Sequence, residues 1–516
     1  MRAGIGQLEQ ASFDVCVIGA GINGAATAQQ LAAAGYRVLL VEKGDFGSGS
    51  SSRSSRLLHC GLRYLAPGTS VFEQFVLHPS RLAIAMRMAR LGMEARRELV
   101  LTTPERVASM NFHFPIWDDS VTKRWQFWLG VQMLARMAPT DVPLGHKLLS
   151  PAAARQVPLV RELRDWDRLK GMGVFTEYQL EWAERLCMDS VLDAERLGAT
   201  VRNYTAASGL ERRGEGWSVR LTDALDGATA TVHARLVLNM AGIWVDKVNA
   251  SSGKAVPRKI FGTKGAHIVV QLPPECANNA IVSFDSHNEP FYCIPWRGLH
   301  YFGPTETVYE GDPDCIHTEE SEIEGLLWQA NHMLPSLGLK RSDVLSTWAG
   351  VRPLTYDPAY PKGKRSRDIH DLAEAGLPGV YAMTAAPVMT YRSGGADMLA
   401  VVQRQLKPSG PLRAVDYATA KYPDAPGSPP IVGDWPKANY ADLAHAAKHE
   451  HATNLVDLMF RRVGAGWTRT MGYEAADRIA EAVAGVYGWD AERTRREAET
   501  YRDYLRRMHS VRPTGA

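Results

Sequence analysis

Three glycines and one glutamate near the N-terminus have the spacing of a dinucleotide-binding turn. Gly19, Gly21 and Gly24 follow an apolar run at residues 14–18, and Glu42 ends the next apolar run. In such a unit the first glycine permits a tight turn, the second lets the backbone approach a pyrophosphate, and the third lets a helix lie against the sheet. A carboxylate at the position of Glu42 binds a ribose hydroxyl and disfavours a 2′-phosphate. The pattern therefore predicts a dinucleotide site that does not take NADP.

A second polar segment, KGDFGSGSSSRSSRLLHCGLRYL at residues 43–65, directly follows. It is crowded with glycine, serine and arginine and ends in an apolar, aromatic run. Backbone amides and hydroxyls of this kind can line a phosphate or the polar edge of an isoalloxazine ring. The alternative is a solvated serine linker, although a linker is not expected to end in such a dense apolar run.

The elements that must position these residues are strands and helices of one parallel sheet. Residues 14–42 read as strand, glycine turn, helix and strand. The apolar run ARLVLNMAGIW at residues 234–244 reads as a further buried strand, where Ala241 and Gly242 permit close approach of a cofactor or form a plain turn. Residues 379–406 read as strand, loop and helix, which predicts that the chain returns to this sheet late.

The composition is that of an ordinary globular protein. The length of 516 residues predicts about three domains, and the 45% hydrophobic and 22% charged residues rule out a collagenous, mucin-like or wholly disordered chain. The net charge of +3 creates no global field for nucleic acid. Six scattered cysteines without a CxxC pair argue against a zinc site or a disulfide framework and favour a reducing compartment. Neither a signal peptide nor a spanning helix is predicted, and no motif predicts a metal site.

Several motifs spread over the chain share their order with one known family. The block at residues 14–65 is followed by KGAHIVV (264–270), IPW (294–296), GPTETVYEGDP (303–313), WAGVRPL (348–354), TYR (390–392) and KHEHATNLVDLMFRR (448–462). In these motifs the chain resembles the FAD-dependent glycerol-3-phosphate dehydrogenases, flavoproteins of the D-amino-acid oxidase superfamily.

The resemblance implies an α/β fold with FAD as cofactor. We expect a discontinuous Rossmann-like FAD-binding domain at residues 12–70, 166–250 and 346–408, a mixed-sheet substrate-binding or cap region at 71–165 and 251–345, and a C-terminal helical domain at 409–516. The implied reaction is oxidation of the secondary alcohol of a small phosphorylated polyol by hydride transfer to flavin N5. The expected case is sn-glycerol 3-phosphate to dihydroxyacetone phosphate, or a close analogue.

The glycine turn and the resemblance together assign the site residues. We expect FAD to contact Gly19, Gly21, Ile22, Asn23, Gly24, Glu42, Ser51, Ser52, Ser54, His59, Gly61, Ala241 and Gly242. We expect the substrate to contact Arg63, Tyr64, His267, Arg352 and Arg392. The expected catalytic group comprises His267 as the acid/base neighbour with Arg352, Arg63 and Tyr64, because histidine accepts protons near neutral pH and guanidinium grips phosphate. Arg352 can instead stabilise charge on the reduced ring or the alkoxide.

The chain departs from the family pattern at three positions. Where the family reads GGK before TYR, this chain has Pro387 at the position of the lysine, so a lysine expected to hold phosphate is absent. In the flavin loop, Cys60 replaces a family glycine and Arg56 replaces a family lysine. Arg392, Arg53 or Lys264 can supply the missing charge. The alternatives are a different anionic hydroxy acid, amino acid or modified sugar as substrate, or a non-catalytic flavin-binding partner protein.

The electron acceptor implied by the family is quinone or oxygen. The stretch TKRWQFWLGVQMLARMAP at residues 122–139 mixes tryptophan, leucine and basic residues as an interfacial helix does, and as a helix packed on the core also does. We expect a cytoplasmic protein, with any attachment peripheral on the inner face of the cytoplasmic membrane. A homodimer is left open.

Overall fold

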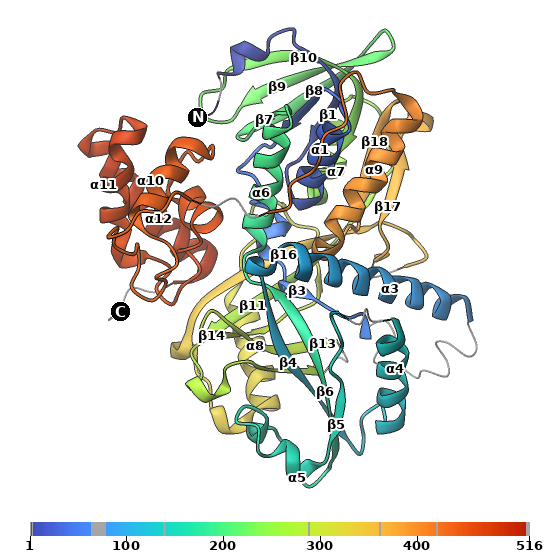
Figure 1. Ribbon diagram of the computed structural model, residues 1–516, viewed down its shortest axis with the longest axis vertical. Coiled ribbons are helices and arrows are strands. Elements are labelled where there is room, and N and C mark those ends of the chain that lie inside the picture. Colours follow the sequence, from blue (N-terminus) through green and yellow to red (C-terminus); the bar gives the residue numbers. More distant parts are fainter. Residues whose placement is uncertain are drawn as a thin grey trace.

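The computed structural model describes residues 2, 4–62, 79–137, 141–286, 289–360, 363–418 and 422–511. Two sheet-centred regions lie one above the other in Figure 1, and a group of helices from the end of the chain lies beside them. Arg63 and Tyr64, two of the predicted substrate-binding residues, lie outside the described residues.

The first sheet contains the predicted dinucleotide unit. Its central strand β1 pairs in parallel with β2 and β10, and the sheet extends through β7 on one side and β18 and β17 on the other. β8 and β9 form the hairpin that joins β10. The bounds of its described strands are β1 (Ser12–Ile18), β2 (Val38–Val41), β7 (Thr200–Arg202), β8 (Thr205–Arg213), β9 (Gly216–Asp223), β10 (Thr229–Asn239), β17 (Asp368–Asp371) and β18 (Val380–Thr384).

Helices cover this sheet closely. β2 and all but the first residue of β1 are buried, which explains their continuous apolar runs. Helix α1 (Ile22–Ala33) packs against α6 (Ala183–Arg196) and α9 (Tyr391–Gln405). A Cβ at Gly395 of α9 would lie 2.9 Å from the Ala26 carbonyl oxygen, so glycine permits this close packing. The predicted late return of the chain to the sheet is confirmed by β18 and α9.

The second sheet is mostly antiparallel and lies below the first in Figure 1. Its order is β15-β11-β14-β13-β12-β4-β6-β3, with β16 paired to β11 and β5 to β6. The bounds of its described strands are β3 (Leu57–Leu58), β4 (Val107–Trp117), β5 (Lys147–Leu149), β6 (Leu169–Leu180), β11 (Ile260–Val270), β12 (Asn279–Phe284), β13 (Pro290–Trp296), β14 (Leu299–Gly303), β15 (Thr307–Val308) and β16 (Val344–Thr355).

Three strands differ from the predicted domain boundaries. β3, β6 and β16 fall in segments expected in the FAD-binding domain, but all three belong to the second sheet, where β3 pairs with β6. The reason is long-range pairing: β6 follows β4 along its whole length, and β16 does the same with β11. Mixed α/β architecture with two mixed sheets and a C-terminal helical domain is otherwise confirmed.

The remaining helices flank the sheets or form the C-terminal domain. The α-helices among them are α3 (Pro79–Thr102), α4 (Arg124–Met137), α5 (Pro151–Ala154), α7 (Val245–Ala250), α8 (Glu320–Met333), α10 (Tyr440–His449), α11 (Ala476–Tyr487) and α12 (Ala491–His509). The short ones used below are η2 (Ser50–Arg53), η6 (Gly242–Trp244), η11 (Val388–Thr390) and the π-helical turn η12 (Asp457–Arg462). Within the described ranges, no helix is both long enough and apolar enough to cross a bilayer.

Buried ion pairs join the C-terminal domain to the first sheet. Asp45, in the loop after β2, accepts hydrogen bonds from both Arg461 and Arg462 of η12. Arg185 of α6 pairs with Glu450 at 2.7 Å. All of these side chains are buried. Because a buried charge is costly without its partner, these pairs fix the C-terminal domain against the loop that follows Glu42.

Candidate active site

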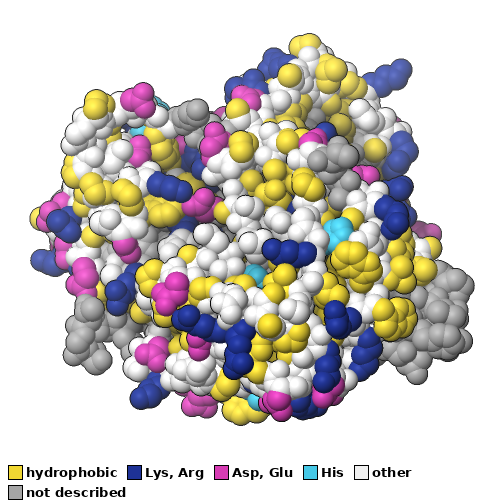
Figure 2. All heavy atoms as spheres, turned by 60° about the horizontal axis from the view of Figure 1, so that its bottom comes forward, with side chains coloured by type: hydrophobic (Ala, Val, Ile, Leu, Met, Phe, Trp, Pro, Cys, Tyr) yellow, Lys and Arg dark blue, Asp and Glu magenta, His cyan; other side chains and the backbone are white. Residues whose placement is uncertain are grey.

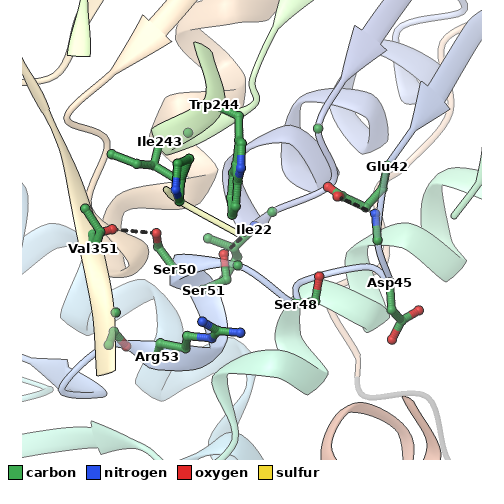
Figure 3. Close-up of a pocket in the computed structure, with 18 of the residues that line it drawn as sticks. Ile22, Glu42, Asp45, Ser48, Ser50, Ser51, Arg53, Ile243, Trp244 and Val351 are labelled. Atoms are coloured by element: carbon green, nitrogen blue, oxygen red, sulfur yellow. Dashed lines mark hydrogen bonds between the residues drawn. The ribbon is translucent and has the colours of Figure 1, made fainter. Parts of the chain in front are cut away.

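A cavity of about 1740 Å³ lies where the two sheets and the C-terminal domain meet. Small-molecule pockets are usually about 300–1,000 Å³, so this one has room for a dinucleotide and a further ligand. It opens at the carboxyl ends of β1 and β10, where α/β sheets bind their cofactors. Figure 3 shows Glu42 and Asp45 on one side of it, Ser50 and Arg53 on another.

The three glycines of the first turn have different roles. Gly19 has a φ of +101°, and a Cβ there would lie 2.7 Å from the Met240 carbonyl oxygen. A Cβ at Gly24 would lie only 1.9 Å from the Gly19 carbonyl oxygen. A Cβ at Gly21 would approach only the Ser51 Oγ, at 3.3 Å, and Gly21 lines the cavity. Gly19 and Gly24 therefore permit the fold, whereas Gly21 leaves room for a ligand's phosphate.

Glu42 presents its carboxylate at the end of β2. Its Oε2 accepts the Ala20 N–H at 2.8 Å and its Oε1 accepts the Gly44 N–H at 3.0 Å. Burial raises the pKa of Glu42, while these two amide hydrogen bonds act in the opposite direction. Each carboxylate oxygen keeps a further acceptor site, which suits the hydroxyls of a ribose.

The serine-rich segment is an ordered wall of the cavity, not a solvated linker. The Ser51 Oγ accepts the Ile22 N–H at 3.0 Å and so caps the first turn of α1 from a distant segment (Figure 3). Ser50 donates to the Val351 carbonyl at 2.6 Å, and Ser52 donates to the Gly47 carbonyl. These bonds hold η2 between the glycine turn and β16.

Most of the residues predicted to bind the cofactor do line this cavity. They are Gly19, Gly21, Ile22, Asn23, Glu42, Ser51, Ser54, His59, Ala241 and Gly242. Gly24, Ser52 and Gly61 are set back from it and act through packing. Gly61, for example, has a φ of +88° and would place a Cβ 2.7 Å from Ala89 Cα of α3. Ile243 and Trp244 of η6 line the cavity without having been predicted, although they end the apolar motif that contains Gly242.

His267 lies on β11, opposite Trp348 of β16. Its ring stacks on the Trp348 indole at a centroid distance of 4.6 Å, and its Nε2 is 2.9 Å from the Ser55 Oγ. Burial, and then the charges of Arg352 and Arg56, lower the pKa of His267 well below its ordinary value. The imidazole is therefore neutral near pH 7, and its lowered pKa makes it a weaker base than an ordinary histidine.

Arg352 also lines the cavity, on the neighbouring strand. Its Nη1 lies 3.6 Å from the Glu306 Oε2, and Glu306 also accepts a hydrogen bond from Arg365. Both Glu306 and Arg365 line the cavity and were not predicted. Glu306 lies inside the motif GPTETVYEGDP, so its place at the site could have been predicted from that motif. Arg365 lies in none of the motifs, and no local sequence pattern predicts its role.

Arg392 is not at the cavity, in contrast to its predicted role. Its buried guanidinium donates to Glu98 at 3.1 Å and to Thr102 at 2.7 Å, and it stacks on Tyr417. This arrangement joins α9 to α3. Pro387, which takes the place of the family lysine, does line the cavity, beside Ala385 and Ala386.

Two family models match this chain. One, described as FAD dependent oxidoreductase, matches residues 14–400, and the other, described as the C-terminal domain of alpha-glycerophosphate oxidase, matches residues 428–494. The chain belongs to the family of FAD-dependent oxidoreductases. FAD is accordingly its cofactor, and the open face of Gly21, the Glu42 carboxylate and the size of the cavity fit this group.

Curated relatives and solved structures agree with this assignment. A glycerol-3-phosphate dehydrogenase of Synechocystis sp. is 29% identical over 558 aligned positions, which cover 97% of each chain. An aerobic glycerol-3-phosphate dehydrogenase of Staphylococcus aureus is 30% identical, covering 78% of this chain and 68% of the relative. The structure of a glycerol-3-phosphate dehydrogenase from Bacillus halodurans complexed with FAD has a TM-score of 0.70 at 20% identity, covering 98% of this chain and 96% of that one. This last likeness concerns the fold.

Proposed function

We propose that this protein oxidises the secondary alcohol of a small phosphorylated polyol, sn-glycerol 3-phosphate or a close analogue, to the ketone. The observation that carries the proposal is the placement of His267 and Arg352 on paired strands of one cavity that also contains the dinucleotide turn. The names of the Synechocystis and Staphylococcus relatives support the choice of substrate.

The proposed roles follow from the environment of each side chain. His267 accepts the hydroxyl proton at its Nε2, the atom that lies 2.9 Å from the Ser55 Oγ at the cavity wall. Its lowered pKa leaves the ring neutral, and so open to a proton, near pH 7. Arg352 holds the anionic end of the substrate or stabilises the developing alkoxide. Trp348 fixes the plane of the imidazole by stacking. FAD, when bound, accepts the two electrons as a hydride at N5.

We further propose that α4 lies against a membrane surface, where a quinone acceptor would be reached. One face of α4 packs on the core through Phe127, Val131 and Leu134. The other exposes Trp125 (66%) and Leu129 (53%). Figure 2 is turned so that the bottom of Figure 1 faces the reader, and on this face hydrophobic and basic side chains lie next to each other. Exposed tryptophan and leucine with flanking lysine and arginine are typical of an interfacial helix. Oxygen is the alternative acceptor.

An anaerobic substrate screen tests the proposed reaction. The FAD-loaded protein is mixed with polyol phosphates, hydroxy acids and amino acids while the flavin absorption band is followed. We expect bleaching with glycerol 3-phosphate and none with amino acids. Bleaching by an amino or hydroxy acid but not by any polyol phosphate would replace the proposal with an acid oxidase. A flavin that stays oxidised throughout, but is reduced by dithionite, would favour a non-catalytic flavin-binding protein.

A further inference from the structure

Resting on the proposed function, we infer that Arg365, together with Arg352, binds the substrate's anionic group in place of the lysine that Pro387 replaces. The inference starts from a shortage of charge. A phosphate needs cationic or amide donors around it, and Pro387 supplies neither a charge nor an N–H. Another cation of the cavity wall must therefore serve if the ligand is a phosphate.

The backbone brings Arg365 to the cavity. At the end of β16, Thr355 exchanges two hydrogen bonds with Lys364: its N–H donates to the Lys364 carbonyl at 3.1 Å and its carbonyl accepts the Lys364 N–H at 2.9 Å. This antiparallel bridge folds the segment that carries Arg365 back alongside the strand that carries Arg352. Both arginines line the same cavity as Pro387.

The two guanidinium groups meet at one carboxylate. Glu306 accepts a hydrogen bond from Arg365, and its Oε2 is 3.6 Å from the Arg352 Nη1. The Glu306 side chain is only 10% exposed, whereas those of Arg352 and Arg365 are 29% and 37% exposed. Two positive charges and one negative charge leave a net charge of +1 in this cluster. A guanidinium carries five N–H donors, so an arginine that binds a carboxylate through one or two of them is able to bind a phosphate as well.

The other candidate cations are less well placed. Lys264 is buried outside the cavity and pairs with Glu322 at 2.8 Å. Arg392 is committed to Glu98 and Thr102 in the same way. Arg53 does line the cavity, but its Nη1 donates to the Ile316 carbonyl at 3.1 Å rather than joining the Arg352 cluster. Of the cations that sequence alone offered as substitutes, Arg53 is thus the competitor to be tested.

Calorimetric titration of the FAD-loaded protein with inorganic phosphate provides the test. We expect Arg365→Gln to raise the dissociation constant about tenfold or more, because a charge-assisted contact is lost. Arg365→Lys should recover part of the affinity, because it keeps the charge without the paired donors. Glu306→Gln should tighten phosphate binding by removing the competing negative charge. Lys364→Gln is the matched control: Lys364 adjoins Arg365 but pairs with Asp368 at 2.9 Å outside the cavity, so its loss should leave phosphate affinity unchanged.

The inference is overturned if Arg365→Gln melts like the parent protein and binds phosphate equally well. It is also overturned if Arg53→Gln, and not Arg365→Gln, abolishes phosphate binding. The heat of phosphate binding does not depend on turnover, so failure of the proposed reaction is recognised separately, as phosphate binding without flavin reduction. Where turnover occurs, Arg365→Gln should raise KM for glycerol 3-phosphate while kcat stays within about twofold, because uniform binding is lost.

Discussion

The buried pair between Asp45 and Arg462 tests how the C-terminal domain supports the cofactor site. The two terminal nitrogens of Arg462 lie 2.8 and 2.7 Å from the two carboxylate oxygens of Asp45, and both side chains are fully buried. Asp45 closely follows Glu42, the expected ribose ligand. Removal of Arg462 should therefore weaken both folding and FAD binding.

The size of the effect follows from the partners that remain. Removing one member of a buried ion pair costs about 3–5 kcal/mol because the other charge stays buried. In Arg462→Met, Asp45 keeps Arg461 and the Asn203 amide at 2.9 Å. We therefore expect the lower end, a loss of about 3 kcal/mol in the free energy of unfolding. The variant should also release FAD more readily.

The pH dependence of this loss has a definite sign. Although burial opposes it, the charges of Arg462 and Arg461 hold the pKa of Asp45 well below its ordinary value. In the unfolded chain an aspartate has a pKa of about 3.9. The pair's contribution is thus fully present above that pH and is lost as the pH falls toward the folded pKa. The difference between the parent protein and Arg462→Met should be constant from about pH 6 to 8 and shrink in acid.

Urea unfolding followed by tryptophan fluorescence, with flavin fluorescence reporting FAD release, measures both effects. Arg496→Met is the matched control, since the exposed Arg496–Glu492 pair should contribute at most about 0.5 kcal/mol. If Arg462→Met unfolds and retains FAD like Arg496→Met, the Asp45–Arg462 pair does not support the cofactor site.

The remaining predictions concern the turn, the base and the membrane face. Gly24→Ala should yield protein without FAD absorbance, because the new Cβ would lie 1.9 Å from the Gly19 carbonyl oxygen; normal FAD content would contradict this. His267→Gln should slow flavin reduction about 10²- to 10⁴-fold with FAD retained. In the parent protein kcat/KM should stay level as the pH falls from about 8 to 6.5, because the pKa of His267 is lowered. A fall in kcat/KM centred at about pH 6.5 would argue against His267 as a base with a lowered pKa. Replacing both Trp125 and Trp128 by serine should reduce co-sedimentation with anionic vesicles without changing urea unfolding.

Local sequence predicted the cofactor half of the site well. The strand, glycine turn and second strand lie within thirty or so residues, so their apolar periodicity and glycine spacing carry the information. The same holds for Ala241 and Gly242, which directly follow the buried end of β10, the strand beside β1. FAD as cofactor was predicted from these features and the ordered motifs, and is confirmed.

The substrate half depends on contacts that local patterns do not encode. Arg365 lines the cavity next to a residue, Lys364, that bridges to Thr355, and it donates a hydrogen bond to Glu306, a carboxylate far away in the sequence. Arg392 was expected at the substrate because of its motif, yet Glu98 of α3 takes its guanidinium. The partner of a long, charged side chain is decided by tertiary packing, which neither periodicity nor motif position specifies.

The most direct test of the central claim uses glycerol 3-phosphate carrying deuterium on the carbinol carbon. The FAD-loaded protein is mixed rapidly and anaerobically with the normal or the deuterated compound, and the flavin band and the ketone product are both measured. We expect bleaching that is slower with deuterium and yields one dihydroxyacetone phosphate for each flavin reduced. An unbleached flavin, or bleaching without the ketone, would contradict the central claim.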